Sequence, residues 1–426
     1  MSKKAVVGLM VGLMASTSWG AGIAFSEHAA SATAVGGAVV STVDDASAIY
    51  YNPGAVARLK GTQFYMGATV VMPSLSYPQN YYGESVTTDS NELVAPVPSA
   101  FATYQIDDEL VAGLGFYLPW GLSSSWPDGP QADQLREQAF RTPTIAPVIA
   151  MDLGDWKEGL SVGAGVDVTF VGFRTERDVF LGDEVGQIFG SATGIGVTGR
   201  FGIHMESPYV DNTKFGLMFR TPMNIELEGD FDFQAPEEFR EIFPADQGAT
   251  GAYTMPWNVA LGMSSTWLED ESLTTSIDIQ YWNWSSSDEI VFNFDDGSST
   301  VLPRDWNDSL TVRFGLEYNL DPVYLRAGYT WDQTPVPTST LTSSLPDVNR
   351  NFFNGGIGAK LGDFVVDVAV SYLHADDRTA LQNDPYGVPK PFTPEDKATY
   401  SVDYIGAAMH IGYTFGGGEE EAAAEE

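Results

Sequence analysis

The sequence predicts an all-β protein, a transmembrane β-barrel of about fourteen antiparallel strands, from three observations. Beyond residue 60 the chain consists of segments in which apolar and polar residues alternate, and this period of two is typical of β-strands. The polar positions are rich in glycine, serine and threonine, and aromatic residues stand at the strand ends. After residue 20, no apolar run reaches the roughly 20 residues that a membrane-spanning helix needs.

The segment 324–331 illustrates the pattern and what it implies about the solvent. Its alternate positions form two faces. The apolar face is Leu325, Ala327, Tyr329 and Trp331, and the polar face is Arg326, Gly328 and Thr330. A soluble β-sandwich would turn a more charged face to water. An aliphatic band that ends in aromatic residues, opposite a glycine-rich face, is typical of strands between lipid and a polar lumen. Because lipid offers the backbone no hydrogen bonds, such strands must close into a barrel.

About fourteen such segments follow one another along the chain, and they lie near residues 62–76, 94–106, 109–119, 143–155, 158–174, 192–206, 213–233, 252–267, 272–294, 307–319, 322–332, 350–361, 363–375 and 400–415. A barrel of this width encloses a lumen that its own side chains cannot fill. Residues 21–60 are rich in Ala, Ser, Gly and Val and show no sustained period. We therefore expect them to form a hatch, or plug, inside the barrel of residues 61–415.

The two ends of the chain have patterns of their own. Lys3 and Lys4 precede a short apolar run, and a small-x-small motif stands just before Ala21, so residues 1–20 are expected to be a cleaved secretory signal peptide. A membrane anchor is the alternative, but the run is short for one. Residues 416–426 are glutamate, alanine and glycine, and they predict a solvated, disordered tail or a docking tail.

Composition argues against several classes of function. The chain has no cysteine, which fits export to an oxidising compartment and excludes cysteine catalysis and thiolate metal sites. The net charge of -36 is opposite in sign to that of a nucleic-acid-binding surface. The four histidines have no metal-ligand spacing, and no nucleophile-elbow motif is present. We therefore expect no cofactor, metal, nucleic-acid partner or enzymatic activity, with an outer-membrane hydrolase and a purely structural barrel as remote alternatives.

Several motifs occur in a fixed order along the chain. They are A-G-I-A-F-S-E at 21–27, D-D-A-S at 44–47, Y-N-P-G-A at 51–55, F-R-T-P at 219–222 with G-D-F at 229–231, W-D-Q-T-P-V-P at 331–337 with L-P-D-V-N-R at 345–350, and S-Y-L-H at 371–374. As an ordered set, running from Ala21 to Phe415, they resemble the FadL/TodX family of outer-membrane transporters for long-chain fatty acids and aromatic hydrocarbons.

The resemblance implies a fourteen-stranded barrel in the bacterial outer membrane, with the hatch inside and a kinked third strand that opens a lateral gap. Ligand would enter at an extracellular groove, pass to an inner pocket and leave sideways into the bilayer. The implied cargo is a long-chain fatty acid, with neutral aromatic or aliphatic hydrocarbons as the alternative. We expect a monomer whose partners are this ligand and membrane lipid. One departure is that Phe415 is followed by the acidic tail, whereas barrels of the family usually end on their terminal aromatic residue.

Two short patterns predict special backbone geometry. Asn52, Pro53 and Gly54 form a turn signal, which we interpret as a tight turn that anchors the hatch. Gly113, Gly115 and Pro119 lie in the expected third strand, where Gly and Pro mark bulges or lost ladder bonds. They are candidates for the lateral gate, although barrel strands often contain glycine without one.

Apolar residues beyond the third strand suggest where ligand is captured. Trp120, Leu122 and Trp126 predict a hydrophobic groove, and residues 133–140 are compatible with a short helix. A loop that only packs on itself is the alternative. Ile23 and Phe25, in the apolar start of the mature chain, complete the predicted ligand contacts.

Basic residues are scarce, so those that face the lumen matter. Arg174 and Arg177 end the expected fifth strand, where the resemblance places a partner for a fatty-acid carboxylate. A lumenal ion pair with one of the many acids is the alternative. A second basic position of the family aligns near Asn307, and the nearest cation is Arg304. This departure leaves neutral hydrocarbons open as ligands.

Overall fold

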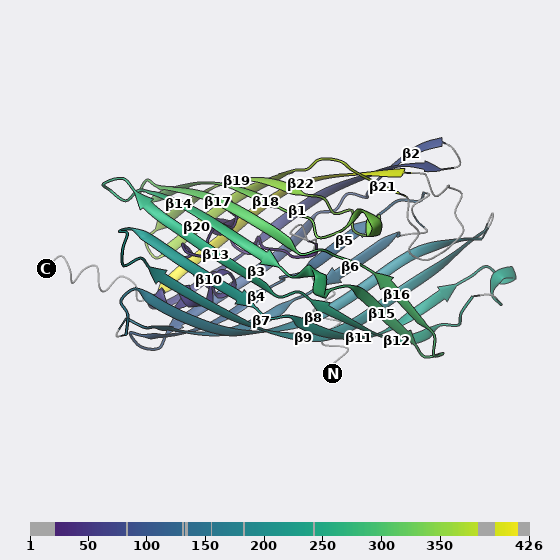
Figure 1. Cartoon of the computed structure of the whole chain (residues 1–426), viewed down its shortest axis with the longest axis horizontal. Coiled ribbons are helices and arrows are strands. Elements are labelled where there is room, and N and C mark those ends of the chain that lie inside the picture. Colours follow the sequence, from purple (N-terminus) through teal and green to yellow (C-terminus); the bar gives the residue numbers. More distant parts are fainter. Residues whose placement is uncertain are drawn as a thin grey trace.

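The alternating segments of the sequence form one antiparallel β-sheet that closes on itself in the computed structural model of the chain (Figure 1). The structure describes residues 22–415 except 82–83, 130–131, 133–134, 155, 182–183, 242 and 382–396. The first strand, β1 (Thr62–Tyr81), pairs with the last, β22 (Lys397–Phe415), and this pairing closes the barrel. The expected signal peptide and acidic tail lie outside the described residues.

Fourteen wall strands run up and down the barrel, which confirms the predicted fold class. Within the described ranges, seven are continuous, namely β1, β3 (Ala95–Gln105), β8 (Leu160–Leu181), β9 (Glu184–Glu206), β18 (Val323–Asp332), β19 (Arg350–Leu361) and β22. The others consist of two pieces, namely β4 (Leu110–Tyr117) with β5 (Gly121–Ser125), β6 (Glu137–Arg141) with β7 (Thr144–Asp152), β10 (Thr213–Arg220) with β11 (Met223–Gln234), β12 (Gln247–Met255) with β13 (Asn258–Trp267), β14 (Leu273–Trp282) with β15 (Glu289–Phe294), β16 (Ser299–Pro303) with β17 (Ser309–Asn319), and β20 (Phe364–His374) with β21 (Arg378–Leu381). A further strand, β2 (Glu84–Asp89), forms a hairpin with the end of β1.

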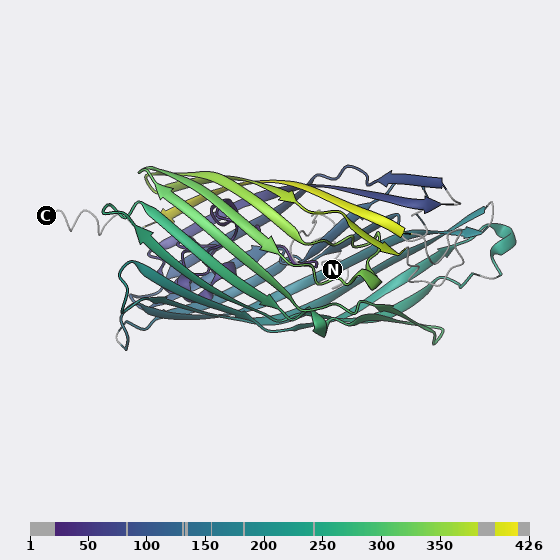
Figure 2. The same ribbon diagram turned by 45° about the horizontal axis from the view of Figure 1, so that its top comes forward.

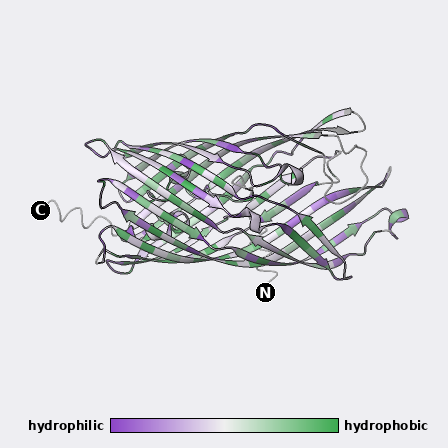
Figure 3. Cartoon of the chain, viewed as in Figure 1, coloured by the Kyte–Doolittle hydropathy of each residue, from purple (hydrophilic) through white to green (hydrophobic). Residues whose placement is uncertain are grey.

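The wall strand β7 shows why the sequence alternates. Its side chains are alternately buried and exposed, with Thr144, Ala146, Val148 and Ala150 toward the lumen and Ile145, Pro147, Ile149 and Met151 on the outside. Figure 3 shows hydrophobic and hydrophilic residues interspersed along the wall strands. Because successive side chains of a strand point to opposite faces, one face contacts lipid and the other the lumen.

Aromatic rings and loop lengths orient the barrel. Outward rings of four neighbouring wall strands form a row with centroid separations of 6.5, 6.1 and 5.3 Å, namely Phe201, Phe219, Trp257 and Tyr281. Such a row is typical of the aromatic girdle at a membrane surface. One end of the barrel has short turns, such as residues 320–322 and 362–363, and the other has longer loops, such as 333–349. Short turns face the periplasm in barrels of this kind, so the long-loop end is extracellular.

Residues 22–60, which we call the hatch, contain α2 (Ala30–Ala34), α3 (Ala48–Tyr51) and η1 (Pro53–Arg58). Figures 1 and 2 show these coils inside the barrel, toward the short-turn end. The hatch has little regular structure, so its carbonyl groups need other donors. Wall hydroxyls supply them, since Thr69 donates to Glu27 O at 2.6 Å, Ser99 to His28 O at 2.6 Å and Thr330 to Gly36 O at 2.7 Å.

Glycines on the lumen face let the hatch backbone touch the wall. A Cβ at Gly163, Gly202 or Gly216 would overlap hatch residues, which are Pro53, Asn52 and Val40 respectively. The glycine-rich polar face of the sequence therefore reflects the close approach of a second backbone.

The loops contain three further single-turn helices within the described part of the chain, namely η3 (Glu237–Phe239), η4 (Trp284–Ser286) and η5 (Thr338–Thr340). The short helix expected near residues 133–140 was wrong in its second half, because Glu137–Arg141 form the strand β6. The long strand β8 extends beyond β7, and β6 pairs with that extension. No helix among the described residues is long and apolar enough to cross a membrane.

Candidate functional site

The third wall strand is broken at residues 118–120. Its lower piece, β4, pairs with β3 as far as Ala100 and Phe116. Its upper piece, β5, begins at Gly121 and pairs with β6. In the described part of the chain, residues 95–99 of β3 keep a ladder only with β1. The wall therefore loses its regular ladder on one side of β3, at the level of Pro119.

The start of the hatch takes up the backbone groups that this break releases. The amide of Phe25 donates to Pro119 O at 2.9 Å, and the amide of Gly121 donates to Ile23 O at 3.0 Å. Ala24 and Trp120 form an isolated antiparallel bridge between these two hydrogen bonds. Ile23, Phe25 and Trp120 are all buried. Three of the residues predicted as ligand contacts are thus brought together at the break.

The fourth wall strand is interrupted at the same level, at Thr142 and Pro143. The amide of Trp120 donates to the Thr142 hydroxyl oxygen at 3.0 Å, and that hydroxyl donates to Trp120 O. The amide of Phe170 in β8 donates to Pro143 O at 2.9 Å. The break in the third strand is therefore held from both sides, by the hatch and by its neighbour in the wall.

The three predicted gate residues separate in the structure. Pro119 lies in the break itself. Gly113 and Gly115 lie below it, in the regular ladder of β4 with β3 and β7. A Cβ on either glycine would stand 2.8 Å from the Ile49 side chain of the hatch. Both glycines therefore make room for the hatch, and they do not shape the break.

The predicted hatch turn lies at the start of η1. Asn52 Oδ1 accepts a hydrogen bond from the Gly54 amide at 2.9 Å, and its Nδ2 donates to Val40 O at 2.7 Å and Ile203 O at 3.0 Å. Ser161 donates to Gly54 O at 2.8 Å. This buried turn holds the hatch to the wall.

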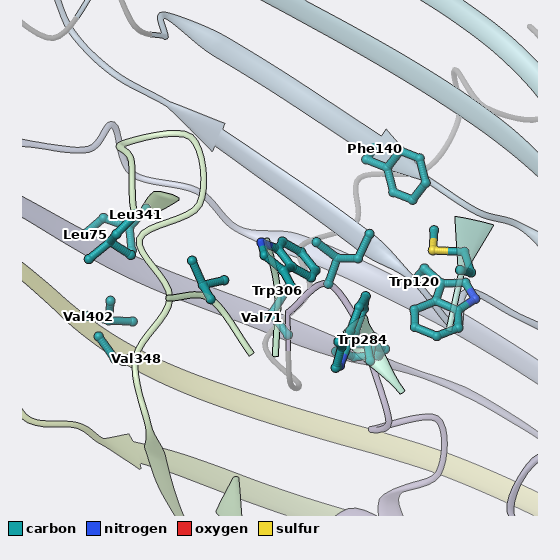
Figure 4. Packing of buried hydrophobic residues seen from close by; sticks show 14 of the residues in the cluster. Val71, Leu75, Trp120, Phe140, Trp284, Trp306, Leu341, Val348 and Val402 are labelled. Atoms are coloured by element: carbon teal, nitrogen blue, oxygen red, sulfur yellow. The ribbon is translucent and has the colours of Figure 1, made fainter. Parts of the chain in front are cut away.

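Four buried tryptophans gather beside the break, and the sequence analysis identified only one of them. Trp120 lies 5.5 Å from Trp282 and 5.8 Å from Trp284 between ring centroids, and Trp284 lies 4.9 Å from Trp306. Each is at most 5% exposed. Figure 4 shows Trp120, Trp284 and Trp306 among the surrounding apolar side chains. The alternation Trp282-Asn-Trp284 at the end of β14 was the available signal, since it turns both rings to one face.

A cavity of about 320 Å³, which we call the outer cavity, lies above this cluster toward the extracellular end. Its apolar lining comes from β5, the β15–β16 region and the loop 333–349, and includes Leu122, Ile290, Leu302, Trp306 and Val336. The predicted groove residue Leu122 thus lines it. Trp126 packs instead against Tyr77, with ring centroids 6.3 Å apart.

The outer cavity contains one half-buried arginine, Arg304, among its lining residues. Its guanidinium carbon lies 4.4 Å from the ring centroid of Trp306 and 4.8 Å from that of Tyr253, and Nη1 donates to Tyr253 Oη at 3.2 Å. No carboxylate of a described residue lies within ion-pair distance of it. The ring faces hold the cation in an apolar setting.

The two predicted arginines of the fifth wall strand do not form one site. Arg174 is exposed, on the same face of β8 as the outward Val166. Arg177 is half-buried and lies on the opposite face, with Phe173. Phe173 stacks on the lumenal Phe292, with centroids 6.2 Å apart. Only Arg177 is therefore on the lumen side of the wall.

A buried charge cluster connects the wall to the hatch below the tryptophans. Arg200 Nε donates to Asp167 Oδ1 at 2.9 Å, and Arg200 Nη1 donates to Tyr50 O at 2.6 Å. Tyr117, the last residue of β4, donates to the same Asp167 oxygen at 2.8 Å. Arg220 pairs with Arg200 in the ladder, and its Nη2 lies 3.7 Å from Asp167 Oδ2. Sequence analysis missed this cluster, whose signal was charge at lumen-facing positions in the apolar middle of β8 and at Arg200 and Arg220.

His28 lies in the hatch against the same cluster. Its ring centroid lies 4.3 Å from that of Tyr50 and 5.1 Å from that of Phe25, and Nε2 is 3.1 Å from Phe25 O. Burial lowers the pKa of His28 well below its ordinary value, and the nearby Arg220 cation acts in the same direction. His28 is therefore neutral, which suits its apolar surroundings.

A closed barrel with a lipid-facing band, an inner hatch, a break in the wall and a partly apolar extracellular cavity defines a channel for hydrophobic molecules. The family model of the outer membrane protein transport proteins (OMPP1/FadL/TodX) matches residues 11–415, and the chain belongs to this family. It is an outer-membrane transport channel for hydrophobic compounds, and it is not an enzyme.

Relatives and solved structures agree with this assignment. The long-chain fatty acid transport protein of Escherichia coli (strain K12) is 22% identical over 90% of this chain and 94% of its own length. The crystal structure of a Pseudomonas aeruginosa FadL homologue has a TM-score of 0.82 at 16% identity and covers 93% of this chain and all of its own. The crystal structure of the P. putida toluene transporter TodX has a TM-score of 0.71 at 17% identity, and the match covers 93% of this chain and 99% of TodX. At these identities the structural likeness establishes the fold.

Proposed function

We propose that the protein takes up long-chain fatty acids across the outer membrane. The observation that carries the proposal is Arg304, a cation without an acidic partner in the described chain, set against Trp306 in a partly apolar cavity at the extracellular end. A carboxylate in an apolar pocket is costly unless a cation or several donors pair with it. A neutral hydrocarbon needs no such partner, because it gains only from burial of apolar surface.

The proposed route has three stages. The molecule first enters the outer cavity, with its alkyl chain on Leu122 and Trp306 and its carboxylate near Arg304. It then passes the tryptophan cluster. It leaves through the break at residues 118–120 once residues 23–25 of the hatch withdraw from Pro119 and Gly121. Withdrawal of these residues must also release Phe25 O from the Tyr50 hydroxyl, which donates to it at 2.9 Å.

A second candidate is the uptake of neutral aromatic or aliphatic hydrocarbons by the same route. The outward position of Arg174 favours it, because one of the two predicted carboxylate partners is absent from the lumen. Similar proteins include transporters for both kinds of cargo. One relative is named a long-chain fatty acid transport protein, and one similar solved structure is that of a toluene transporter.

Uptake of labelled hexadecanoate and hexadecane, in a bacterial host without its own fatty-acid transporter, distinguishes the two. Arg304→Gln is expected to lower hexadecanoate uptake by about tenfold, the effect of losing roughly 1.4 kcal/mol of pairing. Hexadecane uptake should not change. The matched control is Arg240→Gln, which removes the same charge from an exposed loop position. Equal hexadecanoate uptake by native protein and Arg304→Gln would refute the role of Arg304, and uptake of hexadecane alone would favour the second candidate.

A further inference from the structure

A second, smaller cavity lies deeper in the barrel, between the hatch and the wall. It has a volume of about 30 Å³, and we call it the inner cavity. The residues that matter in its lining are Ser26, Arg220, Asn258, Gln280, Trp282 and Arg313. A space of this size accommodates one or two water molecules or a single carboxylate group.

The charged residues that line the inner cavity are all basic. Arg220 and Arg313 both line the inner cavity, and both are buried. None of its lining residues carries a carboxylate. Arg313 faces the buried Asp278 across the ladder and donates to Gln280, so the guanidinium that lacks close partners is that of Arg220. Because a buried charge is costly unless it is paired and hydrogen-bonded, Arg220 calls for an anionic or strongly accepting occupant of the cavity.

Arg220 differs in this respect from its ladder neighbour Arg200. Arg200 donates to Asp167 at 2.9 Å and to Tyr50 O at 2.6 Å. Arg220 is 2% exposed, and its contacts with described residues are the 3.7 Å approach to Asp167 and ring contacts with Tyr50 and Trp120. Its buried Nε has no acceptor among them. A guanidinium carries five N–H donors, so most of the hydrogen-bonding capacity of Arg220 is unused within the protein.

Hydrogen bonds among Arg313, Gln280 and Asn258 leave the Asn258 amide as a further donor at the inner cavity. Arg313 Nη1 donates to Gln280 Oε1 at 2.8 Å, and Gln280 Nε2 donates to Asn258 Oδ1 at 3.0 Å. These two bonds fix which end of the Asn258 amide is oxygen, because the opposite orientation would bring two N–H groups together. Asn258 is fully buried, and its Nδ2 has no acceptor in the described chain.

We propose that the inner cavity is an anion site, which receives the carboxylate group of the transported molecule after it leaves the outer cavity. Arg220, Arg313 and the Asn258 amide would supply the donors. The inference rests on the proposed function and deepens it, because it makes a carboxylate the recognised feature of the cargo.

Two relationships place this site on the route. Trp282 lines the inner cavity and Trp306 lines the outer one, and Trp284 lies between them with centroids 6.0 and 4.9 Å away. Ser26, at the other side of the inner cavity, directly follows the segment that bonds to the break. A carboxylate bound there would lie between the tryptophan cluster and the exit.

Asn258→Asp tests the site with a nearly isosteric change. The new carboxylate can still accept the bond from Gln280, and it places a fixed negative charge where the ligand's charge would bind. Asn224→Asp is the matched control, since Asn224 is exposed on β11 and the change adds the same charge. A second variant, Asn258→Ala, removes the donor without adding charge. Heat-modifiable migration on gels checks that each full-length variant forms the barrel.

The measurement is binding of hexadecanoate and of hexadecanol, two probes with the same chain, to the purified full-length protein in detergent. Asn258→Asp is expected to weaken hexadecanoate binding by about tenfold or more, and Asn258→Ala by less, because like charge is added only in the first. Hexadecanol binding should not change, and Asn224→Asp should behave as the native protein for both probes.

Unchanged hexadecanoate binding in both Asn258 variants would overturn the inference, including the case in which the cavity holds only a small free anion. Equal loss of both probes would also overturn it, since the carboxylate would not be what the site recognises. If the native protein binds neither probe, the proposed function fails instead, so the two failures are distinguishable.

Discussion

The amide of Phe25 donates a hydrogen bond to the carbonyl oxygen of Pro119 at 2.9 Å, so the start of the hatch is bonded directly to the break in the wall. The reverse bond, from Gly121 to Ile23, completes a short antiparallel pairing. A break in a barrel wall leaves backbone groups without partners, which lipid cannot supply. The hatch therefore has two roles in this architecture, since it fills the lumen and also completes the wall.

The first prediction concerns the lumen. Deletion of residues 21–60 should leave a barrel that conducts ions. The inner face of the wall is polar, and the hatch occupies the space beside the glycines of the wall. Conductance of single channels in planar bilayers measures this. Deletion of residues 416–426 is the control and should leave conductance low. Conductance equal to that of the native protein after hatch deletion would contradict the prediction.

The second prediction concerns Gly113 and Ile49. Gly113→Val should destabilise the protein by about 1–3 kcal/mol, the usual cost of overpacking, because a Cβ there stands 2.8 Å from Ile49. Ile49→Ala in the same chain should restore part of that loss, although Ile49→Ala alone is destabilising. The midpoint of heat modification on gels reports each variant. Simple addition of the two losses in the double variant would show that the residues are independent.

The fold was predictable from the sequence because its cause is local. Each wall strand alternates between lipid and lumen, and this alternation is visible in a segment such as 324–331 without knowledge of its neighbours. The strand β6 was not predictable in this way, because Glu137–Arg141 alternate weakly and become a strand by pairing with the extension of β8. Its formation depends on a partner more than 30 residues away in the chain.

The candidate site was predictable only in part, for the same reason. Phe25, Trp120 and Leu122 were recognised from apolar patches near each other in the sequence or from the resemblance. The partners Trp282, Trp284 and Trp306, and the pair Arg200 and Arg220, come together only through closure of the sheet. Arg174 and Arg177 are three residues apart in one strand, and an odd separation turns two side chains to opposite faces. One therefore points outward and the other toward the lumen.

The third prediction concerns the buried ion pair. Asp167→Asn should destabilise the protein by about 3–5 kcal/mol, because it leaves the fully buried Arg200 without a counter-charge. Arg200→Gln with Asp167→Asn together should cost less than the two single changes summed, since neither charge is then left unpaired. Urea-dependent unfolding in detergent measures the differences. Additive losses would show that the pair is not coupled.

The fourth prediction concerns pH. The pKa of His28 is lowered well below 6.5 by burial and then by Arg220, so folding favours the neutral form. A histidine with a depressed folded pKa contributes its stability fully above the unfolded value, and that stability is lost as pH falls below about 6.5. The protein should therefore unfold at a lower temperature at pH 5 than at pH 8, and His28→Gln should reduce this difference. Comparison of the two proteins isolates the contribution of His28. An identical pH dependence in both would contradict the prediction.

The last prediction concerns the exit route, and the absence of native cysteine allows a clean test. Ala24 and Trp120 face each other between two inter-strand hydrogen bonds, a position in which Cα atoms of antiparallel strands lie roughly 4.5 Å apart and a disulfide can form. Ala24→Cys with Trp120→Cys should therefore crosslink the hatch to the break under oxidising conditions. If cargo leaves through the break, the oxidised protein should lose uptake of hexadecanoate while the outer cavity still binds it, and a reductant should restore uptake. Trp120→Cys alone is the control, because it removes the same ring from the tryptophan cluster without a crosslink. Equal uptake by the oxidised and reduced double variant, with the crosslink verified by mass spectrometry, would exclude the lateral exit and would require the cargo to pass through the hatch itself.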